Sequence, residues 1–142
     1  EQMLNDESTK YWKIVVDSTP VGAVVLSEIN SVEQTCSWAI YLGDSSMRGL
    51  GVAHAACLLS LNFAFDVLNL GMVRCEAIAE NTRAIGLYEQ VGFVSQPTQA
   101  EAVRRGESNL AIVKLELSGN AWKLSKNGLQ QTLNEKGVSL DG

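Results

Sequence analysis

A glycine-rich hexapeptide is the stretch of this chain best suited to chemistry. It runs Arg48-Gly49-Leu50-Gly51-Val52-Ala53, and a long apolar helical pattern follows it directly. The first turn of a helix carries backbone N–H groups without intrahelical partners, and the helix dipole adds partial positive charge there. Glycine lets a ligand approach this backbone closely, and Arg48 can add a charge-assisted contact. The sequence therefore predicts a seat for a phosphate or pyrophosphate group.

Strand and helix patterns on both sides of the hexapeptide define the scaffold that would hold it. Three β-rich runs with short polar turns precede it, which predicts an antiparallel meander. A long helix, a strand, a short helix capped by Asn81-Thr82, a strand and an amphipathic helix follow it. The stretch from Gln96 to Glu107 is expected to be a polar loop. The expected strands are 11–16, 21–30, 35–42, 72–79 and 109–117, with a short one beginning at 93, and the expected helices are 49–68, 83–90 and 121–133.

Composition limits the class of protein. A chain of 142 residues suits one domain with a sizeable core, and 46% hydrophobic and 19% charged residues are typical of a globular protein. The net charge of −5 argues against non-specific binding of nucleic acid. No run reaches the roughly 18 apolar residues of a membrane span, and no signal peptide opens the chain. We therefore expect a cytoplasmic protein without nucleic-acid or membrane partners.

Three cysteines and one histidine bear on metal and redox chemistry. Cys36, Cys57 and Cys75 are widely spaced, and His54 is the only histidine. A zinc site would need about four grouped ligands, so we expect no metal. Each cysteine lies in an apolar run, which predicts a buried thiol and fits a reducing compartment.

A second motif, residues 81–93, allows the chain to be compared with a known family. Its sequence is NTRAIGLYEQVGF, which is similar to the pattern N-x-x-A-x-x-x-Y-x-x-x-G-F. The hexapeptide resembles the acyl-CoA signature Q/R-x-x-G-x-G/A. Both motifs, in this order of strands and helices, resemble the GNAT superfamily of acyl-CoA-dependent N-acyltransferases. The resemblance covers about residues 11–117, and residues 100–106 are partly similar to the branch of ribosomal-protein alanine and pseudaminic-pathway aminosugar acetyltransferases.

The resemblance implies a fold and a reaction. The fold is α/β, with a twisted, mostly antiparallel sheet flanked by helices, and strands 35–42 and 72–79 splay at the cofactor site. The reaction is acetyl transfer from acetyl-CoA to a primary amine, by direct attack, on a small molecule or a protein N-terminus. The pyrophosphate is implied to lie on the hexapeptide backbone, and the pantetheine arm along the strand at 35–42. The implied coenzyme contacts are Ile40, Leu42, Arg48, Gly49, Leu50, Gly51, Val52, Ala53, Asn81, Ala84 and Tyr88.

Tyr88 is the predicted general acid for the departing thiolate. A phenol has a pKa near 10, so it keeps its proton at neutral pH. Packing of a helix face is the alternative role for this side chain. The general base stays open among Glu28, Glu33 and Glu76, each of which could deprotonate an ammonium directly or through water. A solvated surface carboxylate is the alternative for all three.

For three further residues, a structural role is the default interpretation. Trp38 and Tyr41 lie near the expected cleft, where core packing competes with lining the acceptor or pantetheine channel. His54, just past the glycines, is expected to be structural.

The resemblance departs from the family pattern before the strand at 11–16. Members usually place a strand and one or two helices there, and these form part of the acceptor site. We therefore expect residues 1–120 to be an N-terminally incomplete acetyltransferase domain and 121–142 a helical extension and tail. Either the sequence is a fragment, or the segment 121–133 or a second subunit covers the gap. A second subunit would make a homodimer.

The sequence is also compatible with two rival functions. One is a non-catalytic acyl-CoA-binding or interaction module that has lost its acceptor site. The other is a dinucleotide-binding domain, which the sequence disfavours because GxGxxG is only partly present and the acidic residue expected about twenty positions later is missing.

Overall fold

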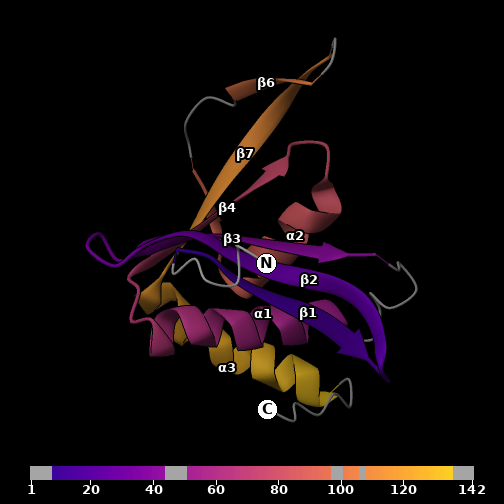
Figure 1. Ribbon diagram of the computed structural model, residues 1–142, viewed down its shortest axis with the longest axis vertical. Coiled ribbons are helices and arrows are strands. Elements are labelled where there is room, and N and C mark those ends of the chain that lie inside the picture. The colour runs from indigo at the N-terminus through magenta and orange to yellow at the C-terminus, as the bar shows by residue number, and fades with distance from the viewer. Residues whose placement is uncertain (1–7, 44–50, 97–100, 106–107, 136–142) are drawn as a thin grey trace.

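The structure, a computed structural model, describes residues 8–43, 51–96, 101–105 and 108–135 of the chain. One sheet runs through the molecule, and α1 and α3 lie side by side against it (Figure 1). The strands are β1 Lys10–Val16, β2 Thr19–Asn30, β3 Thr35–Leu42, β4 Met72–Ile78, β5 Val94–Ser95, β6 Glu101–Arg105 and β7 Ser108–Ser118. The helices are α1 Val52–Asn62, α2 Thr82–Val91 and α3 Gly119–Glu135, and a π-helical turn, η3 Phe63–Val67, continues α1.

The sheet has the order β1-β2-β3-β4-β7-β5, with β6 also paired to β7. The predicted meander is confirmed, because β1 and β2, and β2 and β3, pair antiparallel. The pair β3–β4 is parallel and short. It joins Thr35 to Met72, Cys36 to Val73 and Ser37 to Arg74. Beyond these three pairs the two strands diverge, as the resemblance implied.

One face of the sheet is buried and carries the core. Alternate residues of β3 and β4 point into it, among them Cys36, Trp38, Val73 and Cys75, as the period of two along a strand requires. All three helices contribute to this one cluster. The three cysteines are free and buried, which confirms the prediction for them. The opposite face of β4 carries exposed charged side chains such as Arg74.

The long predicted helix changes form before its end. It was expected to reach residue 68, but the α-helical part stops at Asn62 and a π-helical turn follows. Phe63 in this turn packs edge-on against Trp12 of β1, with ring centroids 5.1 Å apart. Phe65 stacks on Trp122 of α3 at 6.3 Å. The wider turn lets two aromatic side chains, two residues apart, reach two different elements.

The prediction of a polar loop over residues 96–107 is wrong for its second half. There, β6 pairs antiparallel with β7 from Glu101–Ile112 to Arg105–Ser108. β5 pairs with the same side of β7 farther along, through Val94–Glu116 and Ser95–Leu115. An edge strand needs no apolar run, because it is paired on one side only. The polar composition of this segment therefore did not indicate a strand.

The predicted C-terminal helix is confirmed as α3. Trp122, Leu129 and Leu133, expected as its apolar positions, are all buried. The indole Nε1 of Trp122 donates to Asn62 Oδ1 of α1 at 3.1 Å. Burying each such side chain contributes roughly 1.5–3 kcal/mol, so α3 is anchored to the core that the sheet and α1 share.

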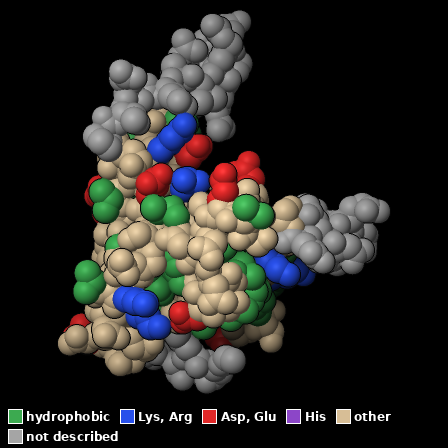
Figure 2. Space-filling view, turned by 90° about the vertical axis from the view of Figure 1, so that its left-hand side faces the viewer, with side chains coloured by type: hydrophobic (Ala, Val, Ile, Leu, Met, Phe, Trp, Pro, Cys, Tyr) green, Lys and Arg blue, Asp and Glu red, His purple; other side chains and the backbone are tan. Residues whose placement is uncertain are grey.

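None of the helices in the described ranges is long and apolar enough to cross a bilayer. On the side of the molecule in Figure 2, basic and acidic side chains lie next to one another, so this face carries no broad field of one sign.

Candidate functional site

The start of α1 has the geometry expected of an anion seat. Gly51 precedes the helix with φ 83° and ψ 8°, in the left-handed region that favours glycine. As the N-cap it offers no side-chain acceptor to the N–H groups of the first turn, Val52 and Ala53 among them. No side chain within the described ranges caps this turn, so its donors suit a bound anion. The other predicted contacts of the hexapeptide, Arg48, Gly49 and Leu50, lie outside the described residues.

The divergence of β3 and β4 forms the second part of the site. Ser37 and Arg74 are the last paired residues, so Trp38 and Cys75 are the first beyond the pairing. We call this point the vertex. Past the vertex, β3 pairs with β2, for example Ile40 with Val24 and Leu42 with Gly22. Its other edge has no strand partner within the described ranges, so the peptide groups of β3 are open to an added extended chain.

Tyr88 lies at the vertex on the helix side of the sheet. The residue is 7% exposed, and its ring meets the Trp38 ring edge-on, with centroids 5.4 Å apart and an interplanar angle of 81°. Burial raises the pKa of Tyr88 to about 12, and the nearby Cys75, Cys57 and Tyr41 add to the shift. The phenol therefore keeps its proton throughout the neutral range. The protonated phenol can therefore donate a hydrogen bond to a departing thiolate, although the raised pKa makes it a weaker acid than an ordinary tyrosine.

The ends of α2 explain the spacing of the second motif. Asn81 is the N-cap, and its Oδ1 accepts from the Ala84 N–H at 3.2 Å, which confirms the capping interpretation. Gly92 ends the helix with φ 123°. A Cβ at Gly92 would lie 2.7 Å from Ser125 Oγ. The motif therefore fixes both ends of the helix that carries Tyr88.

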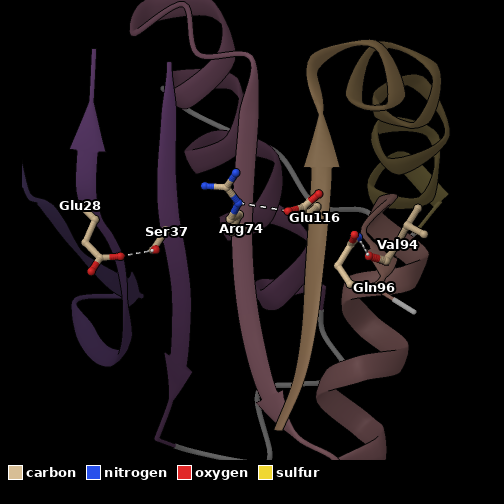
Figure 3. Close-up of polar contacts among 6 residues, drawn as sticks. All are labelled: Glu28, Ser37, Arg74, Val94, Gln96 and Glu116. Atoms are coloured by element: carbon tan, nitrogen blue, oxygen red, sulfur yellow. Dashed lines mark hydrogen bonds and ion pairs between the residues drawn. The ribbon is translucent and has the colours of Figure 1, made fainter. Parts of the chain in front are cut away.

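Polar side chains cross the other face of the sheet beside the vertex (Figure 3). Ser37 Oγ donates to Glu28 Oε1 at 2.8 Å. Arg74 Nε lies 3.1 Å from Glu116 Oε2 in an exposed ion pair. Glu28 stands in the bulge of β2 with φ 51°, a conformation that costs a non-glycine residue energy. The bulge directs its carboxylate to Ser37.

Of the remaining candidate residues, three are exposed and Trp38 is buried. Glu76 is exposed on β4, two residues past Arg74, and its Cα partner on β7 is Lys114. Glu33 lies in the exposed β2–β3 turn, and Tyr41 is 62% exposed near the end of β3. Trp38 is 2% exposed, which confirms core packing as its main environment. His54 Nε2 lies 3.2 Å from Gln90 Oε1, and its buried Nδ1 has no partner in the described part of the chain.

Sequence reasoning missed the groups that surround these candidates. Ser37, Glu116 and Ser60 each contact a candidate or its neighbour, but none belongs to a motif. The alternation of β4 and β7 places Arg74 and Glu116 on the outer face, yet their pairing depends on the register between two strands about forty residues apart. A single sequence carries no signal for that register.

Comparison with known proteins decides the family. The family model of the acetyltransferase (GNAT) domain matches residues 1–94. The chain belongs to the GNAT acetyltransferase family. Spermidine N(1)-acetyltransferase from Escherichia coli (strain K12) is 30% identical over 93 residues, which cover 66% of this chain and 50% of that protein. The Vibrio cholerae spermidine N(1)-acetyltransferase is 32% identical over 76 residues, covering 54% of this chain and 43% of that one. The match thus spans about half the length of these relatives or less.

Solved structures agree on the GNAT fold. A mutant spermidine N-acetyltransferase from Vibrio cholerae superposes with a TM-score of 0.76 at 21% identity, covering 85% of this chain and 72% of that one. A structure described as a probable acetyltransferase gives 0.77 at 19% identity, covering 85% and 68%. The predicted GNAT fold is therefore confirmed, including the mostly antiparallel sheet flanked by helices.

Proposed function

We propose that this chain transfers an acetyl group from acetyl-CoA to a primary amine at the vertex of β3 and β4. The observation that carries the proposal is the position of Tyr88. A buried, protonated phenol lies where the two strands part, against the first residues beyond their pairing, Trp38 and Cys75. A thioester lying between the strands would bring its sulfur to this phenol.

The described residues fit acetyl-CoA as the acyl donor. The uncapped first turn of α1, with Gly51, Val52 and Ala53, suits the pyrophosphate. The unpaired edge of β3 at Ile40 and Leu42 suits the amide-bearing pantetheine arm. Asn81 and Ala84 bond to each other as a helix cap, so any coenzyme contact from them would use their remaining surface.

The reaction needs one bond to form and one to break. The neutral amine attacks the thioester carbonyl carbon, the new C–N bond replaces the C–S bond, and the sulfur takes the proton of Tyr88. The nitrogen then gives up its surplus proton, which returns to the Tyr88 phenolate directly or through water. A carboxylate accepts the proton that the ammonium loses, either directly or through water. Glu28 and Glu76 are the candidates on the open face of the sheet. No acyl-enzyme is required.

A polyamine is the acceptor class we place first. The relatives named above are spermidine acetyltransferases. The open face beside the vertex holds the carboxylate of Glu28 (Figure 3), Glu76 is exposed on β4, and the chain has a net charge of −5. These charges favour a cationic acceptor over an anionic one. Aminosugars and protein N-terminal amines are the alternatives.

Release of the coenzyme A thiol tests the proposal. We expect turnover with spermidine, compared in one assay with an aminosugar and a peptide bearing an N-terminal alanine. Tyr88→Phe should lower kcat by about 100-fold, the usual contribution of a general acid. Tyr11→Phe is the matched control, because Tyr11 is an exposed residue of β1, and it should leave kcat unchanged. Folded chain that binds acetyl-CoA but acetylates none of these amines would instead support the non-catalytic alternative.

A further inference from the structure

We infer that Trp38 and Ser60 are positioning residues for Tyr88: the Trp38–Ser60 hydrogen bond fixes the indole against which the phenol ring packs. The inference rests on the proposed function, because it takes Tyr88 to be the general acid. It gives Trp38 a role in the reaction without contact to either substrate.

The indole of Trp38 is held by a buried hydroxyl. Its Nε1 donates to Ser60 Oγ at 2.9 Å, and Ser60 Oγ donates to the Ala56 carbonyl of α1 at 2.6 Å. Ser60 is the only polar residue that is buried within the described ranges. A buried hydroxyl is costly without partners, and here it bonds on both sides. The indole is thus tied to the backbone of α1 and cannot turn without leaving a polar atom unpaired.

The orientation of this indole sets the place of the phenol. Trp38, Tyr88 and Phe93 form an aromatic triangle, with centroid distances of 5.4 Å for Trp38–Tyr88, 5.5 Å for Trp38–Phe93 and 6.0 Å for Tyr88–Phe93. Edge-to-face packing depends on the angle between the rings. A rotated indole would therefore shift the ring of Tyr88 relative to the vertex. Small displacements of a reacting group are costly for the rate.

The molecule contains its own control for this arrangement. Trp122 donates its Nε1 to Asn62 Oδ1 at 3.1 Å, only two residues along α1 from Ser60. It is 1% exposed, and its ring stacks on Phe65 rather than on Tyr88. Both tryptophans are thus buried and donate a hydrogen bond to the same helix. They differ in the aromatic side chains that their rings contact.

Trp38→Phe, Ser60→Ala and Trp122→Phe form the test set, with Ser60→Ala as the milder variant should Trp38→Phe fail to fold. Melting temperature, acetyl-CoA Kd by calorimetry and kcat are measured for each. All three should melt earlier than the wild type. Only Trp38→Phe and Ser60→Ala should lower kcat, by about tenfold, with acetyl-CoA Kd changed by less than about twofold. An equal loss of kcat in Trp122→Phe would overturn the inference, because core damage would then explain it.

A double-mutant cycle separates this inference from the proposed function. If Trp38 acts through Tyr88, Trp38→Phe should lower kcat no further in the Tyr88→Phe background. An equal further loss in that background would overturn the positioning role and leave the proposed function standing. Wild-type kcat in Tyr88→Phe alone would overturn the general-acid role itself.

Discussion

At the scale of single residues, the surroundings of Tyr88 distinguish it from an ordinary helix-packing tyrosine. The sequence predicts this residue from its motif, and the structure adds the reason it stays protonated. Burial is the main cause of its raised pKa. Sequence alone cannot give that cause, because several groups near the ring, Trp38 of β3, Cys75 of β4 and Cys57 of α1, lie far from Tyr88 along the chain.

The raised pKa makes a prediction for the pH dependence of kcat. A phenol with the ordinary pKa of 10.0 would lose its proton near that pH, whereas Tyr88 keeps its proton to about pH 12. The acid form is therefore complete up to about pH 11, and over the part of this range in which the chain stays folded kcat should show no fall assignable to Tyr88. A fall with a midpoint near the ordinary phenol value, absent from the residual activity of Tyr88→Phe, would contradict the assignment.

At the scale of elements, the sequence predicts a feature correctly where that feature depends on residues within one strand, turn or helix. Alternation and turn residues gave the meander, and Asn81 and Gly92 gave the ends of α2. Features that depend on two elements could not be derived this way. In the π-helical turn, Phe63 and Phe65 contact Trp12 and Trp122 of two other elements, and β6 is paired with the edge of β7.

The C-terminal end of α2 provides a stability prediction at this scale. Gly92→Ala places a side chain at φ 123°, 2.7 Å from Ser125 Oγ, so we expect a loss of about 1–3 kcal/mol in the free energy of unfolding. Gly86→Ala in the same helix is the control. Its Cβ meets nothing within 4 Å, so it should stabilise by about 0.5–1 kcal/mol. Urea unfolding measures both, and equal effects of the two changes would contradict the account of the cap.

At the scale of the whole molecule, one core joins the sheet and all three helices. Trp122 and Leu133 of α3 belong to the same cluster as Trp38 and Tyr88. The proposed division into an acetyltransferase domain over 1–120 and an extension over 121–142 is therefore a division along the chain rather than between cores. The homodimer remains a prediction, which sedimentation of the purified chain would test.

The buried thiols predict a loss of stability at alkaline pH. Burial raises the pKa of Cys36 and Cys57 from 9.0 to about 12 and that of Cys75 higher still. Above pH 9 the unfolded chain loses these protons while the folded chain keeps them. Between about pH 9 and its raised pKa, each buried thiol should therefore lower the free energy of unfolding by about 1.4 kcal/mol per pH unit. Below about pH 9 the thiols should have no such effect.

Urea unfolding between about pH 7 and pH 11 measures this slope. Cys36→Ala removes one of the three thiols, so the slope should become shallower by one thiol's share. A free energy of unfolding that stays constant up to about pH 11 would show that the thiols are not protected in the folded chain.

The central claim of this account is that the start of α1 binds acetyl-CoA through its pyrophosphate, and calorimetry tests it most directly. The comparison uses the wild type, Gly51→Asn and Gly51→Asp, because both side chains tolerate the left-handed backbone at this position. They are close in shape and differ in charge. We expect micromolar binding by the wild type, and binding to the Asp variant at least about tenfold weaker than to the Asn variant, because the carboxylate repels the pyrophosphate. No binding by the folded wild type, or equal binding by the two variants, would contradict the claim.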